Sequence, residues 1–205
     1  MWVSTIAHAH CQLPTANCQL PTANYNSPMA LIVFLRGVNV GGYKTFRPSL
    51  LASQLQEYGV VNIGAAGTFV VHNPVSQSRF RDELRRRLPF ETEVMLCPGR
   101  ELIAAATAHP FEGHPVRPDI VRFVSVLPKR PSILPAVPAR FPASGKWLLT
   151  ILSVHGRFVF GLYRREMKAI SALYGMDKLF GMPLTTRNWN TIGAILNVLK
   201  SKHKS

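Results

Sequence analysis

Two short stretches of this sequence combine basic and polar side chains with features that bind anions. The first runs from Arg36 to Lys44 and follows a run of branched apolar residues, so it is predicted to be a loop at the end of a buried strand. Glycines let backbone N–H groups approach an anion, and Arg and Lys supply positive charge. The alternative is a tight turn with an arginine that serves the fold. The candidate ligand-binding residues here are Arg36, Asn39, Gly41, Gly42 and Lys44.

The second stretch, Thr185-Thr-Arg-Asn-Trp-Asn-Thr191, is typical of a helix start. Asn188 or Asn190 can cap the helix, and the N–H groups exposed there attract anions, which Arg187 would strengthen. Trp189 could stack on a base or pack against the core. Capping and packing also explain most of these residues without any ligand. The candidate ligand-binding residues here are Arg187, Asn188, Trp189, Asn190 and Thr191.

Catalytic and metal-binding patterns are not evident in the sequence. It contains no Walker loop, no dinucleotide fingerprint and none of the common hydrolase motifs. His109 and His114 flank Glu112, but no third ligand stands at a known spacing, so no metal site is predicted. Cys97 lies alone in an apolar stretch and is expected in the core. We therefore predict no cofactor and leave open whether the protein is an enzyme.

The first half of the chain contains the pattern of a ferredoxin-like α+β unit. Apolar runs mark its strands, and apolar residues at helical spacing mark its helices. Gly64-Ala-Ala-Gly67 predicts a hairpin between two of the strands. The predicted order is strand 30–35, a helix from Pro48 to Gly59, strands 60–63 and 68–72, helix 79–88, strand 92–97 and a short helix 99–108.

The second half is predicted to be another α+β unit, which ends in a helix over 188–200. A strand over 119–127 precedes an extended proline-rich loop, and His155-Gly156 forms the turn of a hairpin. We expect a lobe over 29–109, a linker over 110–118 and a basic lobe over 119–205. The strands of the two lobes are expected to continue one another.

Residues 1–28 differ from the rest of the chain, because they contain no charged side chain and include the heptapeptide CQLPTAN twice in succession. The codons TGC CAA CTG CCA ACT GCC AAC encode this heptapeptide and consist of one seven-nucleotide unit repeated three times. The segment is therefore expected to be a translated DNA repeat, with Met29 as the biological start. A disordered natural extension is the alternative.

Positive charge is unevenly distributed along the chain. There are 24 Lys and Arg against 10 Asp and Glu, a net charge of +14. Residues 29–119 hold 10 basic and 8 acidic side chains, whereas residues 120–205 hold 14 basic and 2 acidic ones. This asymmetry predicts one surface that faces an anion. No apolar run reaches the roughly 18–20 residues of a membrane span, and cysteine is scarce, so we expect a cytoplasmic protein with no membrane partner.

Both candidate stretches resemble motifs of a known bacterial family, the domain of unknown function 1697 (DUF1697). Residues 34–42 resemble its opening motif, residues 185–191 its closing motif, and residues 55–71 the helix and hairpin between them. The resemblance covers about residues 29–200 and implies two α+β lobes built on ferredoxin-like halves, with no established activity. One departure is Ala66-Gly67-Thr68, where the family usually has Ser-Gly-Asn, which puts in doubt any polar contact of that asparagine.

Three classes of function follow from these observations. The first is binding of an anionic ligand, either nucleic acid or a phosphate-bearing small molecule, by the two stretches together. The second is an enzyme that acts on a small anionic metabolite in a cleft between the lobes. The third is a protein-interaction module or homodimer that uses exposed sheet edges. The sequence favours the first class if the two stretches meet in the fold.

Overall fold

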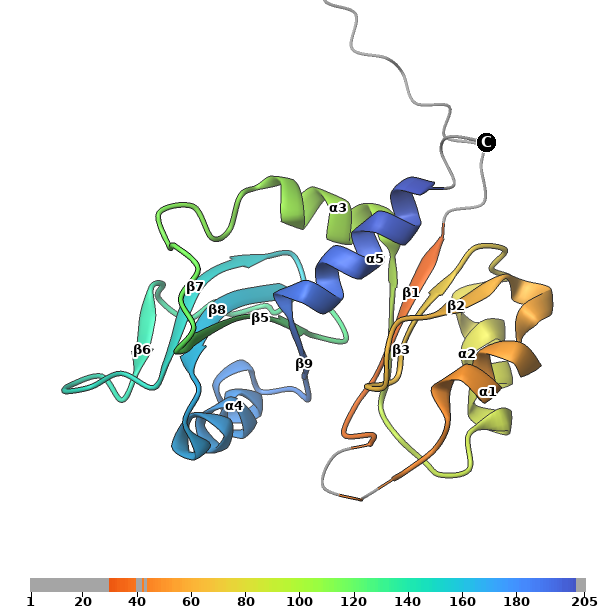
Figure 1. The fold of residues 1–205 in the computed structure, drawn as a ribbon, viewed down its shortest axis with the longest axis horizontal. Coiled ribbons are helices and arrows are strands. Elements are labelled where there is room, and N and C mark those ends of the chain that lie inside the picture. Colours follow the sequence, from red (N-terminus) through yellow and green to blue (C-terminus); the bar gives the residue numbers. More distant parts are fainter. Residues whose placement is uncertain (1–29, 40–41, 43, 202–205) are drawn as a thin grey trace, which may run out of the picture.

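The computed structural model describes residues 30–39, 42 and 44–201 (Figure 1). The N-terminal extension predicted over residues 1–28 and the candidate Gly41 lie outside the described residues. The protein has an α+β fold with two antiparallel sheets, and it ends in a helix, as predicted.

The first sheet has the predicted ferredoxin-like topology, with strand order β2-β3-β1-β4 and antiparallel neighbours throughout. Strand β1 is buried on both faces: Ile32 and Phe34 point to one core, and Val33 to another. Helices α1 and α2 cover the second of these faces (Figure 1). The elements are β1 (Leu31–Leu35), α1 (Pro48–Gln54), a 3-10 turn (Gln56–Tyr58), β2 (Val60–Asn62), β3 (Thr68–Val71), α2 (Gln77–Arg87) and β4 (Val94–Pro98).

The second sheet has five strands in the order β6-β7-β8-β5-β9 and shares no strand with the first. The expectation that the strands of the two lobes continue one another is therefore wrong. Three elements were not predicted: helix α4, strand β9 and strand β6, which lies within the predicted proline-rich loop. The elements are β5 (Ile120–Val126), β6 (Ala139–Phe141), β7 (Leu149–His155), β8 (Phe158–Arg164), α4 (Met167–Phe180) and β9 (Thr185–Asn188).

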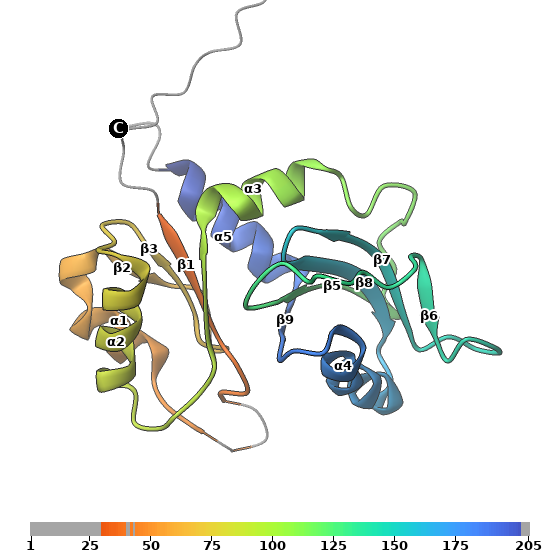
Figure 2. The ribbon, with the colours of Figure 1, turned by 180° about the vertical axis from the view of Figure 1, so that it is seen from behind.

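Two helices, α3 (Gly99–Thr107) and α5 (Trp189–Ser201), lie between the two sheets and join them into one body (Figures 1 and 2). The predicted apolar stripe of α5 is buried, with Ile192 and Ile195 fully inaccessible. These side chains pack in one core with Phe34 of the first sheet and Val124 of the second. Burial of such large aliphatic side chains stabilises a fold by roughly 1.5–3 kcal/mol each, so α5 contributes strongly to the attachment of the two halves.

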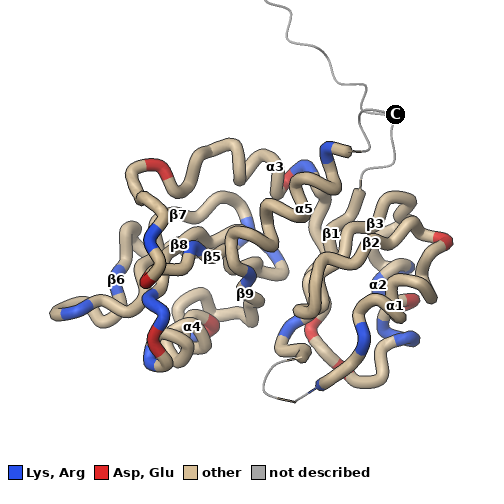
Figure 3. Tube along the Cα trace, viewed as in Figure 1, with Lys and Arg blue, Asp and Glu red and all other residues tan. Residues whose placement is uncertain are grey.

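Lys and Arg are distributed over several elements of the second half rather than over one of them (Figure 3). Some are paired with the few available carboxylates, such as Arg164 with Asp119 and Lys146 with Glu166. Among the helices of the described residues, none has the length and hydropathy needed to cross a bilayer.

Candidate functional site

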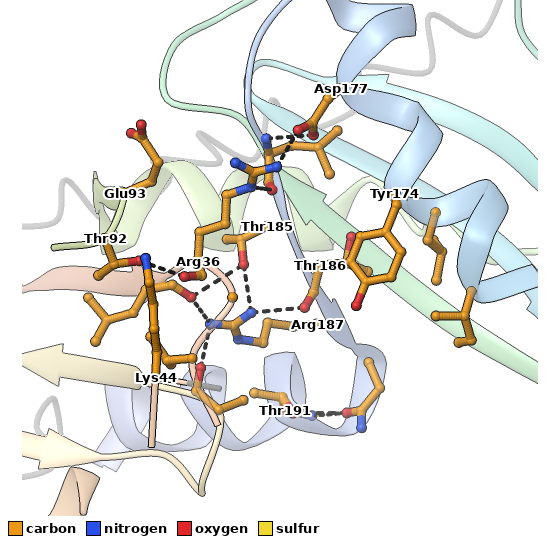
Figure 4. A pocket seen from close by; sticks show the side chains of 18 of the residues that line it. Arg36, Lys44, Thr92, Glu93, Tyr174, Asp177, Thr185, Thr186, Arg187 and Thr191 are labelled. Atoms are coloured by element: carbon orange, nitrogen blue, oxygen red, sulfur yellow. Dashed lines mark hydrogen bonds and ion pairs between the residues drawn. The ribbon is translucent and has the colours of Figure 1, made fainter. Parts of the chain in front are cut away.

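The loop after β1 and strand β9 meet where the two halves join, and a cleft of about 740 Å³ opens above them. The loop and the segment before β4 form one wall, α4 forms the opposite wall, and β9 with the start of α5 forms the floor (Figure 4). Of the nine candidate residues that the structure describes, five line this cleft. They are Arg36, Lys44, Arg187, Asn188 and Thr191.

Arg187 lies at the floor of the cleft, where it is 7% exposed. Its Nε donates a hydrogen bond to Thr68 Oγ1 at 2.7 Å. One terminal nitrogen donates to Thr185 Oγ1 at 2.8 Å and to the Thr186 carbonyl at 2.9 Å. The other donates to the carbonyls of Leu35 at 2.8 Å and Ala66 at 2.7 Å. The guanidinium therefore joins β9 of the second half to β1 and the β2–β3 hairpin of the first.

The Arg187 guanidinium is held by oxygens of neutral groups and pairs with none of the described carboxylates. Burial lowers its pKa to about 10, so the group keeps its charge at neutral pH. All three nitrogens already have acceptors in the fold. Arg187 therefore has no donor left over for an anion, and it serves the fold, a role that the sequence offers as an alternative for Arg36 but not for Arg187.

The Ala66-Gly67-Thr68 turn forms the first half's side of this junction. It offers the Ala66 carbonyl and the Thr68 hydroxyl to Arg187, so Thr68, which stands at the asparagine position of the motif that this segment resembles, supplies a side-chain acceptor. Gly67 has a φ of +65°, and a Cβ placed there would lie 2.6 Å from Val38 Cγ2 and 2.9 Å from Leu35 Cβ. Only glycine fits without displacing these neighbours.

Arg36 lies nearer the mouth of the cleft, and its side chain is 38% exposed. Its Nε donates to the Leu184 carbonyl at 3.0 Å, and a terminal nitrogen forms an ion pair with Asp177 of α4. Asp177 also accepts a hydrogen bond from the Leu184 backbone N–H at 3.1 Å. Arg36 thus holds the loop after β1 against α4 across the cleft, through contacts that are partly open to solvent (Figure 4).

Lys44 reaches the same cleft from the far side of the loop (Figure 4). Its ammonium donates to the Glu91 carbonyl and lies 5.9 Å from the centroid of the Phe90 ring. Asn39 has a different role, because its amide donates to the Ala65 carbonyl at 2.7 Å and its Oδ1 accepts from the Phe46 N–H at 2.9 Å. Asn39 therefore folds the loop, and neither it nor Gly42 lines the cleft.

The start of α5 is capped as predicted, by Asn188 rather than Asn190. Asn188 Oδ1 accepts from the Thr191 backbone N–H at 2.8 Å and from its hydroxyl at 2.9 Å. Asn190 is exposed and does not line the cleft. Trp189 packs edge-on against Phe111, with 5.0 Å between ring centroids. It therefore lies at the edge of the core that the two sheets share, the one that contains Phe34, Val124 and Ile192, and not in the cleft.

Comparison with known proteins identifies the family. A family profile described as "Protein of unknown function (DUF1697)" matches residues 29–140, more than half of the chain. The chain belongs to this family. The matched range ends before β9, so the closing stretch lies beyond it. No curated protein matches the chain.

The chain is also similar in fold to a solved structure, that of conserved bacterial protein SP0830 from Streptococcus pneumoniae. The two proteins are 18% identical, with a TM-score of 0.51 over 83% of this chain and 98% of the other. At this identity the similarity concerns the fold alone.

The cleft also contains polar residues that the sequence did not single out as candidates. Thr92 and Glu93 come from the segment before β4, Tyr174 and Asp177 from α4, and Tyr163 from the end of β8. Partial burial raises the pKa of the Tyr163 hydroxyl. Of these residues, only Asp177 could have been noticed in the sequence, because it is one of two acidic residues after position 119 in a strongly basic segment.

Cys97 lies in the shared core, as expected from the sequence. Burial raises the pKa of its thiol to about 12, so it is protonated at neutral pH and unsuited to nucleophilic attack.

Phe158 and Phe160 alternate along β8 and so lie on one face of the strand. Aromatic side chains at this spacing can stack on nucleic-acid bases, but both are buried in the same core as Cys97.

Proposed function

We propose that the cleft between the two halves binds a small phosphate-bearing molecule. The observation that carries the proposal is the convergence of the two candidate stretches: Arg36 and Lys44 from the first line the same cleft as Asn188 and Thr191 from the second. The start of α5 therefore lines the same cleft as two basic side chains. A helix N-terminus and nearby cations act together on an anion.

The size of the cleft supports a small molecule over nucleic acid. Its volume of about 740 Å³ lies within the roughly 300–1,000 Å³ typical of small-ligand sites. The α4 wall contributes Ile170, Leu173 and Tyr174, and Tyr174 is 67% exposed. These side chains could cover a planar or apolar body while the phosphate faces the opposite wall. A nucleoside monophosphate has this combination of parts.

The basic residues of the cleft differ in the partners that they already have. Arg187 is fully engaged with neutral acceptors, and Arg36 is balanced by Asp177. Lys44 donates to the Glu91 carbonyl and lies near the Phe90 ring. We expect the phosphate to interact with Lys44 and to compete with Asp177 for Arg36.

Calorimetric titration tests this proposal with AMP, adenosine and inorganic phosphate as probes at low ionic strength. We expect AMP to bind at least about tenfold more tightly than adenosine, because hydrogen bonds to a charged phosphate are stronger than neutral ones. We expect Lys44→Gln to lower the affinity for AMP by a similar factor. Arg130→Gln is the matched control, since Arg130 is exposed and does not line the cleft. Equal affinity of AMP and adenosine, or an equal effect of both substitutions, would contradict the proposal.

A second candidate is an enzyme acting on the same class of ligand, which the carboxylates of Glu93 and Asp177 in the cleft favour. Carboxylates placed beside a bound substrate can act as general acids or bases. Prolonged incubation of the protein with the bound probe, followed by mass spectrometry, separates the two: conversion of the probe indicates an enzyme, and an unchanged probe indicates a binding protein.

A further inference from the structure

A second hollow, of about 440 Å³, lies beside the first residue of α5 and shares no lining residue with the cleft. It contains two features that the cleft leaves unexplained: the candidate Trp189 and the His109–Glu112 segment that follows α3. Segments distant in sequence therefore meet there. The lining residues are Ala106, His109, Pro110, Phe111, Glu112, Arg122 and Trp189.

Arg122 is the unusual residue of this pocket. It belongs to β5, where alternation places it on the same face as Val124 and Val126, which are both buried in the shared core. Its guanidinium lies 5.3 Å from the centroid of the Phe111 ring, and one terminal nitrogen donates to the His114 carbonyl. Its Nε is buried without a hydrogen-bond acceptor among the described residues.

Two other arginines of the second half have carboxylate partners, whereas Arg187 is held by neutral oxygens at every nitrogen. Arg157 pairs with Glu101 at 2.9 Å, and Arg164 pairs with Asp119 at 3.4 Å. Arg122 makes no ion pair with any carboxylate in the part of the chain that the structure describes, although Glu112 lines the same pocket. A guanidinium has five N–H donors and binds planar carboxylates in a bidentate manner. Arg122 therefore has the capacity to bind a carboxylate that the fold does not provide.

The other lining residues of the pocket restrict the charge of the ligand and the chemistry of the body that carries its carboxylate. The apolar part of the lining consists of two aromatic residues, Phe111 and Trp189, and two small ones, Ala106 and Pro110. The Glu112 carboxylate lies on the same lining and would repel a second negative charge on a ligand. A monoanion with an apolar body fits this combination, and a phosphate dianion does not.

We propose that this pocket is a separate binding site for a small monocarboxylate with an aromatic or branched aliphatic body. The carboxylate accepts hydrogen bonds from Arg122, and the body lies against Phe111 and Trp189. The site is independent of the inter-half cleft and of whatever the cleft binds.

Phenylacetate and its neutral isostere phenylacetamide test the proposal on the whole protein, by titration calorimetry and by amide-shift mapping in NMR spectra. We expect phenylacetate to bind at least about tenfold more tightly than phenylacetamide, because only the former makes charge-assisted hydrogen bonds. Arg122→Gln is expected to abolish that preference, whereas the matched control Arg130→Gln and the cleft variant Lys44→Gln are expected to retain it. Chemical shifts of Ala106 and Trp189 should move on binding.

Three outcomes would overturn the proposal. They are equal binding of the acid and the amide, a preference that survives Arg122→Gln, and shift changes that avoid Ala106 and Trp189. Competition by inorganic phosphate at the same shifts would assign the pocket to phosphate and also overturn it. If Arg122→Gln does not fold, the comparison of the two probes on the wild-type protein still decides.

Discussion

Arg187 and Arg36 stand in the two candidate stretches and line one cleft, yet their surroundings differ. Arg187 is buried, its three nitrogens donate to neutral oxygens of both halves, and it has no described carboxylate partner. Arg36 is partly exposed and pairs with one carboxylate, that of Asp177. The two ends of the cleft are thus chemically distinct although the residue type is the same.

This difference separates the part of the site that maintains the fold from the part that can respond to a ligand. A buried guanidinium with all its acceptors in place is costly to alter, because each acceptor left unpaired loses a hydrogen bond without regaining water. A partly exposed ion pair contributes little to stability and can exchange partners. The floor of the cleft is therefore expected to determine stability, and its mouth is expected to determine affinity.

Arg187→Lys should have the largest effect. Lysine keeps the charge but cannot reach the acceptors that the planar guanidinium serves, so buried oxygens and a buried ammonium are left without partners. We expect a loss of about 3–5 kcal/mol in the free energy of unfolding, measured by urea denaturation. Arg130→Lys, at an exposed position, is the matched control and should change it by less than about 0.5 kcal/mol. A loss below about 1 kcal/mol in the free energy of unfolding of Arg187→Lys would show that the contacts of Arg187 do not hold the two halves together.

Labelling of Cys97 should report the same effect kinetically. Because burial raises the pKa of this thiol to about 12, it stays protonated as the pH is raised from 7 to 9, and labelling requires opening of the core. We expect Arg187→Lys to accelerate labelling about a hundredfold, in line with a loss of about 3 kcal/mol. Peptide mass spectrometry distinguishes Cys97 from Cys11 and Cys18. An unchanged rate at Cys97 would show that the shared core does not depend on Arg187.

Two glycines of the β2–β3 turn allow the cost of a steric clash to be distinguished from the cost of a side chain at positive φ. Both have positive φ, +65° at Gly67 and +74° at Gly64, but only at Gly67 would a Cβ clash, whereas at Gly64 it meets open space. We expect Gly67→Ala to cost about 3 kcal/mol and Gly64→Ala about 1 kcal/mol in urea denaturation. Equal losses would mean that the close contact with Val38 and Leu35 is unimportant.

Arg36→Gln should have the smallest effect on stability. The ion pair with Asp177 is partly solvated, so we expect a loss of no more than about 1 kcal/mol. The same substitution should lower the affinity for AMP, measured by calorimetry. A loss of stability as large as that of Arg187→Lys would remove the distinction between the two arginines.

The first half could be predicted from sequence because its signals are local. Residues 31–35 are an unbroken apolar run, and Phe80 and Leu84 mark one face of α2, so both elements follow from periodicity alone. The ferredoxin-like order of elements then restricts the strand pairing.

The second half and the junction depend on contacts that periodicity does not report. Strand β9 consists of Thr, Thr, Arg and Asn, without apolar alternation, and becomes a strand by pairing with β5. Helix α4 has Met167 and Tyr174 exposed and Gly175 in its interior, which obscures its apolar face. The structural role of Arg187 could not be inferred, because its acceptors are mostly backbone carbonyls, which every residue has.

Hydrogen exchange of the backbone in Arg187→Lys and Arg36→Gln, compared with the wild-type protein, tests most directly whether Arg187 couples the two halves. Our account predicts that Arg187→Lys speeds exchange in β9 and in residues 64–68 together, although they belong to different sheets. It predicts that Arg36→Gln speeds exchange only around the end of α4 and Leu184. Faster exchange confined to β9 in Arg187→Lys, with residues 64–68 unchanged, would contradict it.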